Sequence, residues 1–245
     1  MNHFEFSQAG RRQLHGRAGR FFLRKLKLIY TTENVRFIIS SCQITTFVPM
    51  KWYIIPALLI FLHPDTFAQS KLQQFDDRVL EDLAAHRTPG QTKMWRTISN
   101  MNDYVDVGIP VVVLTAGLIK NDPDMKQNAL YIASSTATTF LLNTLIKVIV
   151  KRPRPFVSNV RLKAVYEPTS YSFPSGHTSS AFSATTALAR AYPKWYIIAP
   201  SMVWASAIGY SRMYLGVHYP TDVATGALLG VGTSFALGFI RPGFH

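Results

Sequence analysis

Five apolar stretches dominate the second half of the chain and limit the folds that it can adopt. None of them shows the alternation of polar and apolar residues that a half-buried strand needs. Several are short for a bilayer span and contain Ser, Thr and Gly, which suits helices that pack against one another inside a membrane. We therefore expect an all-α, membrane-embedded helical bundle with about five to six transmembrane helices. The stretches cover residues 105–119, 129–150, 180–191, 195–210 and 223–240.

Two more helices are expected ahead of these stretches. Residues 75–86 place their apolar side chains on one side of a helix, which Pro89 and Gly90 would end. Residues 92–101 form a second, more polar helix. Because neither is apolar throughout, we expect amphipathic helices on the periplasmic surface of the bundle.

The N-terminal part of the chain has a different composition. Residues 1–49 hold eight Lys and Arg against two Asp and Glu, and they contain the only cysteine, Cys42. Residues 50–68 have the layout of a signal peptide, with a charged start, an apolar core and small residues at the end. We expect a functional domain over 69–245, a signal peptide or first membrane helix over 50–68, and an upstream extension over 1–49 from a misassigned start. The alternative for residues 1–49 is a basic cytoplasmic arm that contacts anionic lipid.

One segment offers cations near a helix end. Lys147 and Arg154 are seven residues apart, so a helix that carried both would present them on one face. Pro153 and Pro155 predict that this helix ends beside Arg154. A guanidinium can grip two phosphate oxygens at once, and a lysine adds a compact charge. Taken alone, such a cluster is more typical of the basic flank of a membrane helix.

A second segment, residues 172–180, is typical of a turn that leads into a helix. Ser175 and Gly176 would surround an anion with a hydroxyl group and closely approaching backbone N–H groups. His177 would lie beside that anion as a general acid, and the anion would favour its protonated form. The plainer interpretation is a turn with a helix cap.

The third segment holds Arg212, His218 and Asp222. His218 and Asp222 are four residues apart, which on a helical turn brings the carboxylate beneath the imidazole. One ring nitrogen then stays protonated, and the other is free to attack. Such a pair is more often structural when it occurs alone. Together, the three segments supply the cations, nucleophile, general acid and orienting carboxylate that phosphoryl transfer without a metal needs.

The three segments resemble the type 2 phosphatidic acid phosphatase family, which shares its site with bacterial non-specific acid phosphatases and vanadium haloperoxidases. The family pattern is Lys, six residues, Arg-Pro; then Pro-Ser-Gly-His; then Ser-Arg, five residues, His, three residues, Asp. Residues 147–155, 174–177 and 211–222 meet it in full, and the resemblance extends over roughly residues 75–240. It implies His218 as nucleophile, His177 as acid and base, Asp222 as the orienting carboxylate, and Lys147, Arg154, Ser175, Gly176 and Arg212 as phosphate ligands.

The resemblance also implies a hydrolase without a metal or another cofactor, acting through a phosphohistidine at His218. If residues 50–68 direct the chain outward, five spans place Lys and Arg between them on the cytoplasmic side and all three motifs on the outer side. We therefore expect a lipid phosphate phosphatase of a bacterial inner membrane, with its active site facing the periplasm.

The expected partners are the lipid bilayer and a membrane lipid phosphate, and no nucleic acid is expected. Undecaprenyl diphosphate is the first choice, ahead of phosphatidylglycerophosphate, phosphatidate and a lipid A phosphate. The sequence predicts neither the oligomeric state nor whether a monophosphate or a diphosphate is taken. Three alternatives share the same residues: a soluble periplasmic acid phosphatase, a non-catalytic lipid-phosphate binding or transport component, and a vanadate-dependent halide oxidase.

Overall fold

The computed structural model describes residues 67–243, which belong to the unit Asp65–His245. The upstream extension predicted for residues 1–49 and the signal segment predicted for 50–68 lie outside the described residues, apart from the last two positions of the latter. Over residues 67–243 all regular secondary structure is helical and no strand occurs, which confirms the all-α prediction. The α-helices are α4 (Phe67–Ala85), α5 (Pro89–Ile119), α6 (Pro123–Val150), α7 (Pro155–Ser158), α8 (Gly176–Ala191), α9 (Trp195–Tyr214) and α10 (Pro220–Ala236), followed by the 3-10 turn η3 (Gly238–Ile240).

Helix α5 differs from the prediction, because the two helices expected over 92–101 and 105–119 are continuous. Asn102 and Asp106, which lie near the expected break, bond to each other across one helical turn (2.7 Å) rather than to the backbone. Helix α4 ends at Ala85, ahead of Pro89 as expected, and Pro89 itself begins α5, where its missing N–H is not needed. Thr88 caps this end by accepting a hydrogen bond from the Gln91 N–H (3.3 Å).

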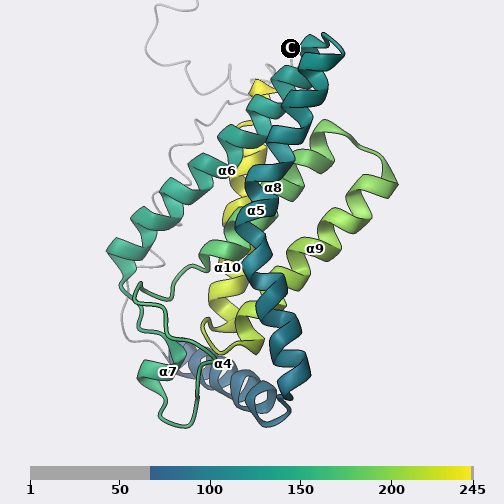
Figure 1. Ribbon diagram of the computed structural model, residues 1–245. Helices are drawn as coiled ribbons and strands as arrows, with labels where there is room; N and C mark the ends of the chain where they lie inside the picture. Colours follow the sequence, from purple (N-terminus) through teal and green to yellow (C-terminus); the bar gives the residue numbers. More distant parts are fainter. Residues whose placement is uncertain (1–66, 244–245) are drawn as a thin grey trace, which may run out of the picture. The chain divides into compact units, whose positions relative to one another are not determined.

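Helix α8 packs against α6, α9 and α10, and α5 packs against α6 and α9 (Figure 1). Two glycines of α10 allow its backbone to approach that of α8 closely. A Cβ at Gly226 would lie 2.7 Å from the Ser175 carbonyl oxygen, and one at Gly230 would lie 2.2 Å from the Ser179 carbonyl oxygen. This small-residue contact brings the start of α8 beside the start of α10.

Helix α4 lies across one end of the bundle, where it contacts α9 and α10 (Figure 1). Its buried Leu80 packs with Leu162 and Tyr219. The connection from α6 to α8, residues 151–175, therefore shares this end with α4 and with the start of α10. All three motifs of the sequence lie in or beside these connections.

Large apolar side chains are exposed along α5 and α6, among them Val111, Leu118, Phe140 and Leu145. The interior, in contrast, holds many hydroxyl and amide groups. Among the described residues, the segments Pro89–Ile119 and Pro123–Ser158 are long and apolar enough to cross a membrane. An apolar exterior around a polar interior is the pattern of a bundle whose outer face meets lipid, and it supports the predicted membrane location.

Candidate active site

His218 lies in the short connection between α9 and α10 and is buried. Its Nε2 is 3.4 Å from Nη1 of Arg154, and its Nδ1 is 3.6 Å from Oδ2 of Asp222. Because an arginine can only donate, the first contact favours the tautomer with its proton on Nδ1, facing the carboxylate. Nε2 is then the unprotonated ring nitrogen, and Nδ1 faces the carboxylate at a distance just beyond a hydrogen bond, so the nucleophilic role of His218 stays a prediction.

Asp222 is fully buried in the first turn of α10 and receives several hydrogen bonds. The Ser172 hydroxyl and the Tyr219 N–H (3.0 Å) donate to Oδ2, and Nη1 of Arg152 donates to Oδ1 (2.7 Å). Burial alone would raise the pKa of Asp222, but His218, Arg152 and Ser172 together hold that pKa below its ordinary value. Asp222 is therefore a fixed carboxylate, which suits the orienting role predicted for it.

Arg152 is a site residue that the sequence interpretation missed. Its guanidinium bridges Asp222 and Asp76 of α4, with Nη2 2.8 Å from Oδ2 of Asp76, and it stacks on the Tyr219 ring at 3.9 Å. The spacing from Lys147 favoured the neighbouring Arg-Pro pair instead. The signal that could have found Arg152 was the repetition of Arg-Pro directly after the helix.

Lys147 and Arg154 do not share a helix face, so that expectation is wrong. Helix α6 ends at Val150, and Lys151 adopts the left-handed conformation (φ 52°) that turns the chain away. Lys147 Nζ donates to the Tyr171 carbonyl oxygen (2.7 Å), and Arg154 Nε donates to that of Ser170 (2.7 Å). The connection that precedes α8 therefore brings the two cations together.

Arg212, in the last turn of α9, is buried and completes the cation cluster, which we define as Lys147, Arg154 and Arg212. Its Nη1 donates to the hydroxyls of Ser99 (2.6 Å) and Tyr166 (2.5 Å). Over residues 67–243, no carboxylate oxygen lies within 4.0 Å of a nitrogen of the cluster. Three partly or fully buried cations without a bound carboxylate form a site that favours an anion.

Ser175 occupies the cap position of α8, as expected for the helix start. Its hydroxyl pairs with that of Thr178 (2.8 Å), and its N–H donates to the Asp222 carbonyl oxygen (3.0 Å). That N–H therefore joins the second motif to the third instead of facing an anion. Gly176 follows as the first residue of the helix. Asn143, which the sequence interpretation also missed, fixes this turn to α6 through the Pro174 carbonyl oxygen (3.3 Å).

His177 lies in the first turn of α8, outside the predicted membrane spans, with about a third of its side chain exposed. Burial and the charges of the whole cation cluster lower its pKa to about 3. Burial also lowers the pKa of His218 to about 3, aided by Arg212 and Arg154 and opposed by Asp222. The charges of Arg154 and Arg212 thus disfavour the protonated form of both imidazoles. A bound phosphate dianion would offset those charges and favour the protonated form of His177 that a general acid needs.

Comparison with known proteins identifies the family. A model of the PAP2 superfamily matches residues 128–241. Decaprenylphosphoryl-5-phosphoribose phosphatase of Mycobacterium tuberculosis is 30% identical over 144 residues, which cover 58% of this chain and 76% of that protein. Undecaprenyl-diphosphatase of Sulfolobus acidocaldarius is 36% identical over 102 residues, which cover 41% of this chain and 49% of the relative. The chain thus spans about half the length of this second relative.

A solved structure agrees with the sequence matches. The crystal structure of a transmembrane PAP2 type phosphatidylglycerolphosphate phosphatase from Bacillus subtilis superposes with a TM-score of 0.61 and 25% identity, covering 77% of this chain and 92% of that one. The chain belongs to the PAP2 superfamily, and the resemblance seen in its three motifs is confirmed. Among the described residues, no three His, Cys, Asp or Glu side chains are grouped to hold a metal ion.

Proposed function

We propose that this protein is a metal-independent lipid phosphate phosphatase that acts through a phosphohistidine at His218. The observation that carries the proposal is the cation cluster, in which Nη1 of Arg154 lies 3.4 Å from Nε2 of His218 and which has no carboxylate within 4.0 Å over residues 67–243. Charge that develops on a transferring phosphoryl group is stabilised best by donors already fixed around it. Hydrogen bonds to other residues of the chain hold the side chains of Lys147, Arg154 and Arg212 in place.

In the first step, Nε2 of His218 attacks phosphorus, and the bond from phosphorus to the leaving oxygen breaks. Asp222 holds the Nδ1 proton and stabilises the positive charge that the ring gains. His177 gives its proton to the leaving oxygen. In the second step, His177 takes a proton from water, the water oxygen attacks phosphorus, and the P–N bond breaks to release phosphate and restore His218.

An apolar groove between α5 and α6 supports a lipid as the substrate. It has a volume of about 810 Å³, and its walls include Val111, Leu130 and Phe140. Asp103 and Ser180 also line it, and both contact His177: Oδ1 of Asp103 is 3.9 Å from Nε2, and the Ser180 hydroxyl donates to the backbone carbonyl (3.2 Å). A hydrocarbon chain in this groove would hold its phosphate beside the catalytic pair.

We propose that α5, α6 and α9 cross the bilayer together with the parts of α8 and α10 that follow their first turns, with the active site facing the periplasm of a bacterial inner membrane. The connections that carry the motifs then lie together on the outer side, and α4 lies on that surface. The exposed apolar faces of α5 and α6 support this arrangement. It predicts that the protein stays with membranes washed in carbonate, whereas release would favour a soluble phosphatase.

Among lipid phosphates, we rank undecaprenyl diphosphate first. Two relatives are named for polyprenyl substrates, undecaprenyl diphosphate and decaprenylphosphoryl-5-phosphoribose, and the apolar lining of the groove suits a hydrocarbon chain. Phosphatidylglycerophosphate comes next, because the Bacillus structure carries that name. Phosphatidate and a lipid A phosphate follow.

The direct test is phosphate release by the purified full chain, in detergent with a metal chelator, across these four lipids and a water-soluble ester. We expect release from at least one lipid in chelator, and a fall of about 10³-fold or more in His218→Ala and His177→Ala. His86→Ala provides the matched control, because His86 is an exposed residue in the turn that follows α4. Activity that depends on added metal, or that survives His218→Ala, would contradict the proposal.

A further inference from the structure

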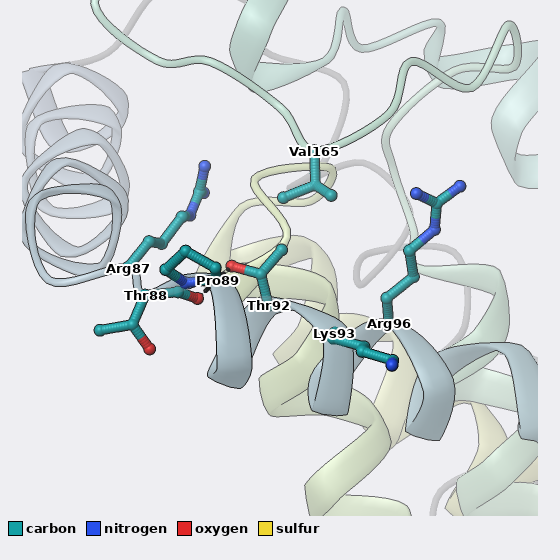
Figure 2. A pocket seen from close by; sticks show the side chains of 7 residues that line it. All are labelled: Arg87, Thr88, Pro89, Thr92, Lys93, Arg96 and Val165. Atoms are coloured by element: carbon teal, nitrogen blue, oxygen red, sulfur yellow. Dashed lines mark hydrogen bonds between the residues drawn. The ribbon is translucent and has the colours of Figure 1, made fainter.

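A second cluster of cations lies outside the catalytic residues, in a cleft at the start of α5. Figure 2 shows the side chains of Arg87 and Arg96 on either side of Val165, with Lys93 beside Arg96 on the same helix. The cleft has a volume of about 530 Å³. It is lined by Arg87, Thr88, Pro89, Thr92, Lys93, Arg96 and Val165, none of which belongs to the three motifs.

The three cations of this cleft have few partners of their own. Nη1 of Arg87 donates to the Lys163 carbonyl oxygen (2.5 Å), while its Nε and Nη2 are buried without a hydrogen-bond partner among the described residues. Lys93 and Arg96 are exposed at the rim. In the part of the chain that the structure describes, no carboxylate oxygen lies within 4.0 Å of any of the three. Like charges held together in this way repel one another unless an anion joins them.

One residue, Tyr166, contacts both a cation of the cleft and a cation of the catalytic site. The guanidinium of Arg96 lies 5.7 Å from the centre of the Tyr166 ring. The hydroxyl of the same tyrosine accepts a hydrogen bond from catalytic Arg212. The cleft is therefore adjacent to the active site but uses different cations.

We propose that the cleft formed by Arg87, Lys93 and Arg96 is a second phosphate-binding site. Arginine forks match the oxygen pairs of a phosphate group, and a lysine adds a point charge. The cleft lies at one end of a helix that is long enough to cross a membrane. The end of such a helix lies at the depth of the lipid headgroups. The phosphate can belong to an anionic phospholipid or be free inorganic phosphate, and the experiment distinguishes these two sources.

The test measures binding to the full-length protein in detergent, without turnover. In the first arm, native mass spectrometry compares retention of short-chain phosphatidylglycerol with that of phosphatidylcholine. In the second arm, titration calorimetry counts the sites for inorganic phosphate. The variants are Lys93→Gln and Arg96→Gln, both at exposed positions, so folding should be unaffected. Arg78→Gln is the matched control, because Arg78 is an exposed arginine of α4 outside the cleft.

If the source is a lipid, each cleft variant lowers the affinity for phosphatidylglycerol about tenfold, and Arg78→Gln does not change it. If the source is free phosphate, wild type has two phosphate sites and Arg96→Gln has one. Arg154→Gln, which disables the catalytic site, should leave the cleft site intact in both arms. Equal binding by wild type and both cleft variants in both arms would overturn the proposal, as would loss of all phosphate binding in Arg154→Gln. Because no arm requires hydrolysis, failure here is separate from failure of the proposed enzyme.

Discussion

The close contact between α8 and α10 predicts that Gly230→Ala damages the site although Gly230 is not a candidate catalytic residue. A Cβ there would lie 2.2 Å from the Ser179 carbonyl oxygen, about 1.2 Å short of ordinary van der Waals contact. Because the obstacle is backbone, the two helices must separate by a comparable distance. Gly226→Ala is milder, since its Cβ would lie 2.7 Å from the Ser175 carbonyl oxygen.

This separation would move His177, in the first turn of α8, away from Asp222 in the first turn of α10 and from His218 in the connection just before it. A displacement of about 1 Å at a catalytic group can cost on the order of 100-fold in rate. We therefore expect kcat to fall about 100-fold in Gly230→Ala and less in Gly226→Ala. The melting temperature should fall in the same order, because overpacking typically costs about 1–3 kcal/mol.

The matched control is Gly232→Ala on the same helix, where an added Cβ would meet nothing within 4 Å. This variant should keep its activity and gain up to about 1 kcal/mol of stability, because alanine favours a helix over glycine. The assay is hydrolysis of a water-soluble phosphoester, with thermal unfolding measured in the same detergent. If Gly230→Ala and Gly232→Ala behave alike, close packing of α8 on α10 does not position the site.

Three further predictions follow from the contacts around His218. Arg152→Gln removes the cation shared by the fully buried Asp76 and Asp222, so the free energy of unfolding should fall by about 3 kcal/mol. The control is Arg161→Gln, which should have almost no effect because Arg161 pairs with Glu81 at the surface. Equal effects of the two variants on thermal unfolding would contradict this prediction. Asn143→Ala removes buried hydrogen bonds to the Pro174 carbonyl oxygen and the Ser179 hydroxyl, so it should lower kcat about tenfold and lower the melting temperature as well. Unaltered steady-state kinetics would refute this. The pKa of His218 is about 3 in the folded protein against 6.5 in a free side chain, so only the unfolded state takes up this proton as the pH falls below 6.5. The free energy of unfolding should therefore fall between pH 6.5 and 3, and His218→Gln should make this fall less steep. The same pH dependence of unfolding in both proteins would contradict the lowered pKa of His218.

Much of the fold could be predicted because its signals are local. Long apolar stretches without alternation predict helices, and Pro220 marks the start of α10 where the first turn needs no N–H. The start of α8 after Ser175 follows from the same kind of turn chemistry. The family motifs then selected the residues that the structure brings together, although the catalytic role of each stays a prediction.

The rest depends on contacts between distant segments or on backbone choices that spacing does not reveal. Arg152 could not be assigned because its partners, Asp76 and Asp222, are 76 and 70 residues away. The helix face expected for Lys147 and Arg154 failed because Lys151 turns the chain at the end of α6. Continuity of α5 depends in part on Ser180 of α8, which accepts a hydrogen bond from Asn102 (3.0 Å).

The most direct test of the central claim is to trap the phosphorylated enzyme. In His177→Ala, a substrate with a good leaving group, such as p-nitrophenyl phosphate, needs no proton donor for the first step, but the intermediate lacks its base for hydrolysis. We predict a burst of about one p-nitrophenolate per chain in chelator, with the added phosphoryl group found on His218 by mass spectrometry under alkaline conditions. A burst that persists in the double variant His177→Ala with His218→Ala, or a phosphoryl group on another residue, would contradict catalysis through a phosphohistidine at His218.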